Sequence, residues 1–272
     1  MKLIIFREIL MVTNTVNMSL PSFDRLPLSQ IKREAARKNL KQKDVIVGIS
    51  RQSVLKNLMT IKENQNGRLL CCVVKADAYG HGLANIVPLI DEQTDAYGIT
   101  RNDDALKIRK MGITKPIIRL GEPSSEEIRD GIQRKLCIEE MVGSLNKAQE
   151  ISFELTQAKS NKSMNIHISL NTGDIGRDGF ECGRKYELLA DFEKICEIEN
   201  LDIKGIMTHF GYAESADQGV QHTKATQFIE ISQWLRRIAN KKGHFPLIHM
   251  TNTSSFTLVC CLPGSGNAPQ AT

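Results

Sequence analysis

The chain has 272 residues, 41% hydrophobic and 25% charged, an ordinary globular composition that can bury a full core. Its formal charge of +5 comes from 36 basic and 31 acidic side chains without a long run of one sign, which argues against a nucleic-acid-binding arm or a membrane-binding patch. No apolar run reaches the roughly eighteen residues of a membrane span, and Arg7 and Glu8 interrupt the first run before it is long enough for a signal peptide, so we expect a cytoplasmic protein.

The first part of the chain, residues 1–43, is predicted to be an N-terminal extension. Turn signals at Pro21 and Pro27 precede a basic helical stretch over 29–41, and a short strand over 45–49 and a helix over 52–62 follow. Seven cysteines occur without a C-x-x-C pair or zinc-ligand spacing, which predicts reduced thiols and no metal site.

From residue 44 to residue 258 short apolar runs alternate with longer amphipathic segments, the rhythm of repeated βα units. The predicted strands are Leu69–Lys75, Ala96–Thr100, Pro116–Leu120, Lys135–Ile138, Asn165–Leu170, Ile203–Thr208 and Pro246–His249. The predicted helices between them include Asn102–Met111, Ser144–Lys159, Tyr186–Glu199 and Val220–Lys242.

Seven such units predict an α/β fold with a parallel sheet, either open and doubly wound or closed as a (β/α)8 TIM-type barrel. The barrel is favoured because the turn after the first strand, Tyr79-Gly80-His81-Gly82, is not the G-x-G-x-x-G of a dinucleotide-binding fold. An eighth strand is not apparent after His249, so we expect a barrel that is incomplete at that position.

A barrel places its active site at the carboxyl ends of its strands, and Lys75 ends the first apolar run. Burial of an isolated ammonium is costly, so such a lysine is predicted to lose its charge or to have it matched, and a neutral amine attacks carbonyl groups. The alternative is a lysine whose stem lies in the barrel wall while its ammonium reaches solvent.

The ten residues from Val73 to Gly82, V-V-K-A-D-A-Y-G-H-G, resemble the cofactor signature of the alanine racemase family. The resemblance implies a pyridoxal 5'-phosphate (PLP) cofactor bound to Lys75 as an aldimine, with Tyr79 at its phosphate. It also implies an amino-acid racemase that acts on alanine or another small amino acid, as in D-alanine biosynthesis.

Two later segments are similar to further motifs of the same family. Thr208-His209-Phe210 resembles the motif whose histidine stacks on the pyridine ring, although a lone strand-end histidine is more often structural. The segment from His249 to Thr253 resembles the motif that places Asn252 and Thr253 near the phosphate. A helix N-cap is the other interpretation of that segment, and the two are compatible, since a helix N-terminus also favours an anion.

The loop over 171–179 resembles the family's fifth-strand loop, in which Arg177 matches an arginine near the cofactor's phenolic oxygen. Outside that context, a loop arginine is usually a surface charge. The loop has one added residue at Asp174, and Ser169 stands where many members carry a modified lysine. Both differences are similar to the broad-specificity branch of the family and leave the substrate open.

The resemblance ends near residue 258. In the family an arginine that bonds the pyridine nitrogen and a second, β-rich domain follow, and a tyrosine of that domain in a partner subunit supplies the second proton-transfer group. Residues 259–272 match neither feature, so we expect a truncated or frame-shifted gene whose intact form is a homodimer. The alternatives are a non-catalytic single-barrel PLP-binding protein and a remnant that binds nothing.

Overall fold

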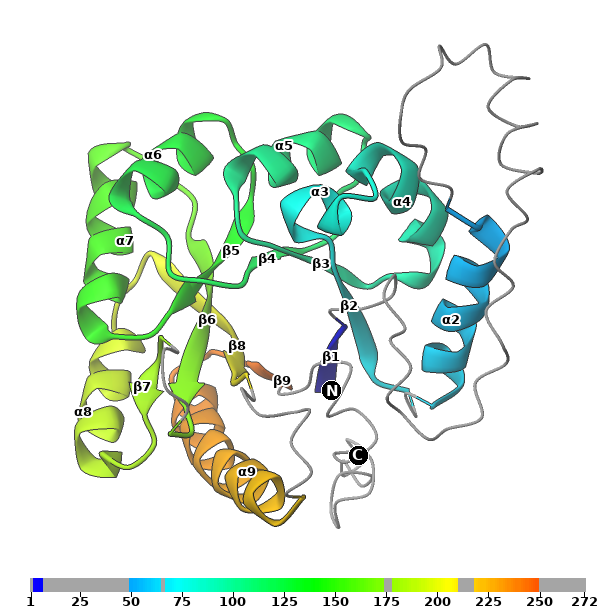
Figure 1. Ribbon diagram of the computed structural model, residues 1–272. Helices are drawn as coiled ribbons and strands as arrows, with labels where there is room; N and C mark the ends of the chain where they lie inside the picture. The colour runs from blue at the N-terminus through cyan, green and yellow to red at the C-terminus, as the bar shows by residue number, and fades with distance from the viewer. Residues whose placement is uncertain (1, 7–48, 65–66, 174–177, 210–217, 250–272) are drawn as a thin grey trace, which may run out of the picture.

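The structure is a computed structural model that describes residues 2–6, 49–64, 67–173, 178–209 and 218–249 (Figure 1). The strands are β1 Lys2–Phe6, β2 Leu69–Val73, β3 Ala96–Ile99, β4 Ile117–Arg119, β5 Ile138–Val142, β6 Met164–Asn171, β7 Phe180–Glu181, β8 Leu201–Met207 and β9 Leu247–His249. The helical segments are α2 Arg51–Asn64, α3 Lys75–Tyr79, α4 Leu83–Ile90, the 3-10 turn η1 Asp91–Gln93, α5 Asn102–Lys110, α6 Ser125–Gln133, α7 Leu145–Gln157, α8 Lys185–Ile195 and α9 Gln218–Lys241.

The described strands form a closed ring. The hydrogen-bonded order is β5-β4-β3-β2-β1-β9-β8-β6-β7, and β5 also pairs with β6. Since β7 pairs only with the end of β6, eight parallel strands remain in the ring. The predicted (β/α)8 class is therefore confirmed.

The strand between β2 and β9 comes from the N-terminal end of the chain. In β1, Leu3 pairs with Leu69 of β2 on one side and with His249 of β9 on the other, both in parallel. Because β1 pairs with both neighbours, it fills the eighth place in the ring, and the expectation of a barrel that is incomplete at the eighth strand is wrong. Residues 2–6 therefore belong to the barrel and not to an N-terminal extension, because their backbone pairs with strands on both sides.

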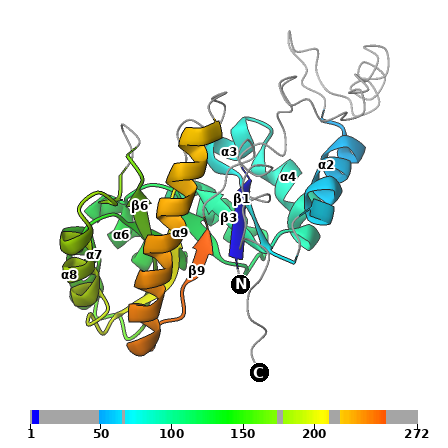
Figure 2. The same cartoon turned by 90° about the horizontal axis from the view of Figure 1, so that it is seen from below.

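Alternating side chains divide the ring into an outer and an inner face. Outward residues of β5, β6 and β8 pack under α6 to α9, and those of β2 to β4 pack under α2, α4 and α5. A smaller inner cluster fills the ring itself and contains Cys71, Val73, Ala96, Ile118, Met141 and Met207. Figures 1 and 2 show the helices outside the strands, so the strand ends are left to form a rim.

The fourth predicted strand was misplaced. The structure has β5 at Ile138–Val142, which shares only Ile138 with the predicted range 135–138. Lys135 and Cys137 have φ values of 53° and 51°, which suit a turn and not a strand. The strand Ile138–Val142 is not predicted by its apolar pattern, because Glu139 and Glu140 interrupt the run of apolar residues.

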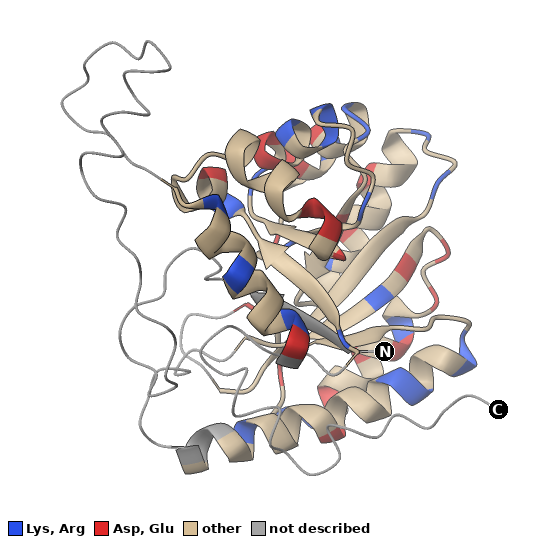
Figure 3. Cartoon of the chain, turned by 90° about the vertical axis from the view of Figure 1, so that its right-hand side faces the viewer, with Lys and Arg blue, Asp and Glu red and all other residues tan. Residues whose placement is uncertain are grey.

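The described helices carry both kinds of charge. Figure 3 shows Lys and Arg interspersed with Asp and Glu over the helices, while the strands are mostly uncharged. Within the described residues, no helix combines the length and the apolar character that crossing a bilayer requires.

Candidate functional site

Lys75 stands at the carboxyl end of β2, where the chain leaves the barrel wall. Cys71 and Val73 belong to the inner cluster, while Leu70, Cys72 and Val74 pack outward. Lys75 follows the last strand residue, Val73, by two positions as the first residue of α3, and its side chain is half-buried. The structure thus places the lysine at the rim, where parallel barrels hold their active sites.

The four residues after Lys75 form a left-handed turn. Ala76, Asp77, Ala78 and Tyr79 have φ values of 53° to 55°, and Gly80 ends the turn at φ 81°. A left-handed conformation costs a non-glycine residue about 1–2 kcal/mol, so the four together cost about 4–8 kcal/mol. Strain of this kind persists only where surrounding contacts enforce it, and it is concentrated at functional sites.

Backbone hydrogen bonds within the segment hold the turn closed. The amide of Ala78 donates to the carbonyl of Val74 at 2.9 Å, that of Gly80 to Ala76 at 3.0 Å, and that of Gly82 to Asp77 at 2.9 Å. The Asp77 carboxylate accepts from the Leu83 amide at 3.1 Å, and this bond is the main cause that lowers the pKa of Asp77. Lys75 is therefore carried by a rigid, strained segment.

Tyr79 and His209 lie at the same rim as Lys75. Tyr79 is half-buried against the inner cluster, which also contains Met207 of β8. His209 is half-buried two residues beyond β8, and Thr208 fixes that strand end by donating from its amide to His249 at 3.2 Å and from its hydroxyl to Leu170 at 2.8 Å. Arg177, Asn252 and Thr253, the other predicted site residues, lie outside the described residues.

The end of β6 is fixed by buried polar side chains. The Ser169 hydroxyl donates to the carbonyl of Asp178 at 3.0 Å, and the Asn171 side-chain amide donates to Glu181 at 2.8 Å. The Asn171 side-chain oxygen accepts from the amide of Gly173 at 3.0 Å. These bonds anchor both ends of the loop that contains Arg177, and Ser169 bonds to that loop's backbone.

Three polar side chains that the sequence does not point to, the half-buried Glu139 and the buried His167 and His249, form a hydrogen-bonded string in the barrel interior. Glu139 Oε2 lies 2.7 Å from His167 Nε2, and His167 Nδ1 lies 2.8 Å from His249 Nε2. The Asn165 amide donates to the other Glu139 oxygen at 3.0 Å. At the far end, no group among the described residues bonds His249 Nδ1, which is buried. We call Glu139, His167 and His249 the Glu-His-His string.

The protonation of the Glu-His-His string follows from its geometry and burial. Burial acts to raise the pKa of Glu139, but the hydrogen bond and charge of His167, with the bond from Asn165, outweigh it and lower the pKa. Burial lowers the pKa of His249 well below its usual value, and the charge of His167 acts in the same direction. An ionised Glu139 and a neutral His249 result, with Nδ1 of His249 as the open end.

The string depends on the absence of a side chain at Gly205. A Cβ at that position would lie 2.1 Å from His167 Nδ1 and 2.8 Å from His249 Nε2, closer than real Cβ contacts allow. Gly205 of β8 pairs with His167 of β6 and with Leu247 of β9, so it lies between the two histidine-bearing strands.

The sequence of β6 indicates that one member of the Glu-His-His string, His167, faces the barrel interior. Its sequence, MNIHISLN, alternates strictly between apolar residues at 164, 166, 168 and 170 and polar residues at 165, 167, 169 and 171. Ile166, Ile168 and Leu170 pack outward against the helices, so a period of two turns the polar series inward. The pairing with Glu139 and His249 could not be read from this segment alone.

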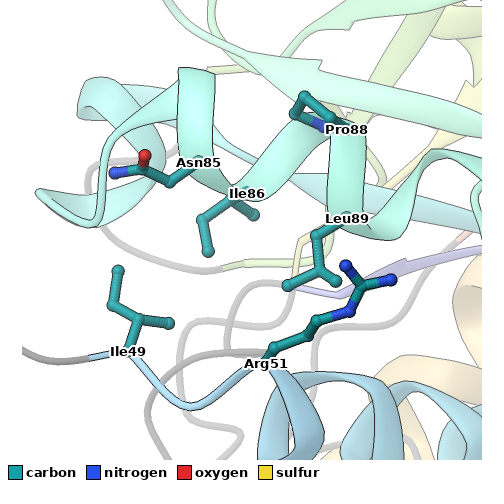
Figure 4. Close-up of a pocket in the computed structure, with 6 residues that line it drawn as sticks. All are labelled: Ile49, Arg51, Asn85, Ile86, Pro88 and Leu89. Carbon is teal, nitrogen blue, oxygen red and sulfur yellow. The ribbon is translucent and has the colours of Figure 1, made fainter. Parts of the chain in front are cut away.

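A separate cavity of about 420 Å³ lies outside the ring, between the start of α2 and α4 (Figure 4). It is lined by Ile49, Arg51, Asn85, Ile86, Pro88 and Leu89. None of these residues ends a barrel strand, so the cavity is distinct from the rim that carries Lys75.

The chain matches known proteins over the barrel. Residues 49–263 match the family model "Alanine racemase, N-terminal domain". A broad specificity amino-acid racemase of Vibrio parahaemolyticus is 33% identical over 203 residues, which are 72% of this chain and 47% of that protein. An alanine racemase of Clostridium tetani is 32% identical over 201 residues, 73% of this chain and 49% of that protein.

Solved structures give the same result. An alanine racemase of Clostridium difficile 630 in complex with cycloserine has a TM-score of 0.64 and 27% identity, with 73% of this chain and 52% of that chain covered. The chain spans about half the length of the curated relatives it matches. The match over more than half of this chain nevertheless shows the family, and the protein is a member of the alanine racemase family through the N-terminal barrel domain.

Proposed function

We propose that the protein is a PLP-dependent amino-acid racemase that interconverts the L and D forms of alanine or another small amino acid. The observation that carries the proposal is the position of Lys75, which is half-buried at the rim of a closed parallel barrel and followed by a strained turn. Curated relatives include a lysine racemase of Proteus mirabilis as well as alanine and broad specificity racemases, which supports an amino-acid substrate without selecting one.

The described residues fit an aldehyde-bearing cofactor. A half-buried amine on a rigid segment suits a covalent bond to an aldehyde, because desolvation favours the nucleophilic form of a lysine. Lys75 would hold PLP through Nζ, Tyr79 would bind its phosphate and His209 would lie against its ring. We assign Arg177 to the phenolic oxygen and Asn252 and Thr253 to the phosphate.

Inversion of an amino acid at Cα requires removal of a proton on one face and its return on the other. When bound, PLP disperses the charge that is left on Cα. Lys75 Nζ would accept and return the proton on its own face, and a second acid-base group is needed on the opposite face. We propose that a partner subunit of a homodimer supplies that group.

Borohydride labelling tests the cofactor assignment. The protein is incubated with PLP, reduced with borohydride and digested, and the labelled peptide is identified by mass spectrometry. We expect the label on Lys75, its loss in Lys75→Ala and its retention in Lys110→Ala, which removes an exposed lysine. An unlabelled Lys75 in the wild-type protein would refute the proposal and favour a remnant that binds nothing.

The activity is tested by incubating the PLP-loaded protein with L-alanine and measuring D-alanine by chiral chromatography. D-alanine that forms with wild-type protein and not with Lys75→Ala supports a racemase. Label on Lys75 without turnover of alanine, lysine or other small amino acids would instead support the single-barrel PLP-binding protein.

A further inference from the structure

Helix α5 packs against the left-handed turn and presents two charged side chains to it. Asp104 Oδ2 accepts a hydrogen bond from the amide of Ala76 at 3.1 Å, across 28 residues of sequence. One turn later in the helix, Lys107 Nζ lies 3.4 Å from the Asp77 carboxylate. Residues three apart lie on the same face of a helix, so one face of α5 contacts the turn at two points, through Asp104 and through Lys107.

Asp104 is unusual because it is buried, with only 5% of its surface exposed. A buried carboxylate is costly unless hydrogen bonds satisfy it. The backbone amide of Ala76 supplies such a bond, while burial itself raises the pKa of Asp104. The carboxylate therefore bonds to the residue that immediately follows Lys75.

The neighbouring helix α6 shows how an acid in this position is ordinarily used. Glu127 is the third residue of α6, and it closes a capping box by accepting from the amide of Ser124 at 3.1 Å. Asp104 is the third residue of α5, but Arg101 makes no side-chain cap and Asp104 bonds to the turn after β2. The side chain that in α6 accepts from the N-cap amide of its own helix instead accepts, in α5, from the segment that follows Lys75.

We propose that Asp104 is a positioning residue for Lys75, holding the left-handed turn by accepting a hydrogen bond from its first amide, that of Ala76. The inference deepens the proposed function and rests on it for the role of Lys75. The partial positive charge at the N-terminus of α5 favours the carboxylate at this place. Without the acceptor, the strained turn loses a contact that connects it to the barrel's helix layer, and Lys75 loses its fixed direction.

Two measurements on Asp104→Ala and Asp104→Asn test the inference. Hydrogen exchange of the Ala76 and Asp77 amides, measured without added PLP, reports the turn itself. The rate of borohydride-trapped labelling of Lys75 at low PLP reports the lysine. For Asp104→Ala we expect about tenfold faster exchange and about tenfold slower labelling. Asp104→Asn keeps an acceptor oxygen and is expected to lie between alanine and wild type.

Two control variants separate this role from a general loss of stability. Asp103→Asn changes an exposed neighbour whose partner is Arg134 and is expected to leave both measurements unchanged. Ile108→Val weakens the core under the same helix and leaves the hydrogen bond between Asp104 and Ala76 in place, so it is expected to leave the labelling rate unchanged.

Each outcome decides a separate question. Unchanged exchange and labelling in Asp104→Ala would overturn the inference, as would equal effects in Asp104→Ala and Ile108→Val. If Asp104→Ala does not fold, the same comparison is made with Asp104→Asn, for which wild-type exchange and labelling would overturn it. If wild-type Lys75 takes no label, the proposed function fails, and the exchange measurement still decides whether Asp104 holds the turn.

Discussion

Gly205→Ala is the sharpest test of the Glu-His-His string. The added methyl group would lie 2.1 Å from His167 Nδ1, 2.7 Å from its Cε1 and 2.8 Å from His249 Nε2. Both rings sit in a packed interior, so neither can move away without displacing a neighbour. We expect the bond between the two histidines to break.

The cost has two parts. Overpacking of a tight core costs about 1–3 kcal/mol, and leaving a buried polar group without its partner costs about 1–3 kcal/mol more. The variant is therefore expected to lose about 2–6 kcal/mol in the free energy of unfolding, measured by urea denaturation. For a protein of this size, even the lower value lowers Tm by about 4 °C.

Two comparisons make the test specific. Gly183→Ala adds a methyl group where no heavy atom lies within 4 Å, and it is expected to change stability by less than about 0.5 kcal/mol. In a His167→Ala background the methyl at residue 205 loses its nearest contact, so its cost is expected to fall by about 1 kcal/mol or more. An equal loss in both backgrounds would refute the proposed clash.

Three further predictions concern buried titratable groups. Because the folded-state pKa of His249 is lowered, unfolded chains take up a proton below about pH 6.5 that folded chains do not, so stability is lost as the pH falls from that value. His249→Gln is expected to flatten urea-derived stability between pH 5 and 7 by up to about 1.4 kcal/mol per pH unit, and an unchanged slope would contradict the assignment. Glu140→Ala leaves the guanidinium of Arg119 buried after loss of a 2.6 Å ion pair, and a loss of about 3–5 kcal/mol is expected in urea, with less than 1 kcal/mol as the contrary result. Cys137 is the exposed thiol among the described cysteines, whereas burial raises the pKa of Cys72 to about 12. Native labelling with a thiol reagent is therefore expected to lose a fast-reacting site in Cys137→Ser, and fast reaction at Cys72 would contradict the fold.

The sequence predicted the fold class well because the alternation of apolar runs and amphipathic segments is a local signal. The runs ending at Lys75 and Thr208 became β2 and β8, and the helix from Ser144 became α7, with Ser144 as its N-cap. The strand β1 could not be foreseen, because its place depends on pairing with β2 and β9, far away in the chain.

The candidate site was only partly predictable. The motif around Lys75 identified the lysine, but four successive left-handed residues carry no sequence signal, since none of residues 76–79 is glycine. The contact of Asp104 with Ala76 and the bond between His167 and His249 join segments 28 and 82 residues apart. Contacts at that range follow from the ring's closure and not from local composition.

The pairing of β1 with β9 also constrains the order of folding. Residue 2 pairs with residue 248, so the contact between β1 and β9 that closes the ring joins segments far apart in the sequence. During synthesis β1 leaves the ribosome long before its partner β9, while β2 to β5 can pair with one another as they emerge. Long-range pairing of this kind slows folding and leaves unpaired strand edges exposed meanwhile. A nascent chain of this protein is accordingly expected to rely on chaperones until β9 has been made.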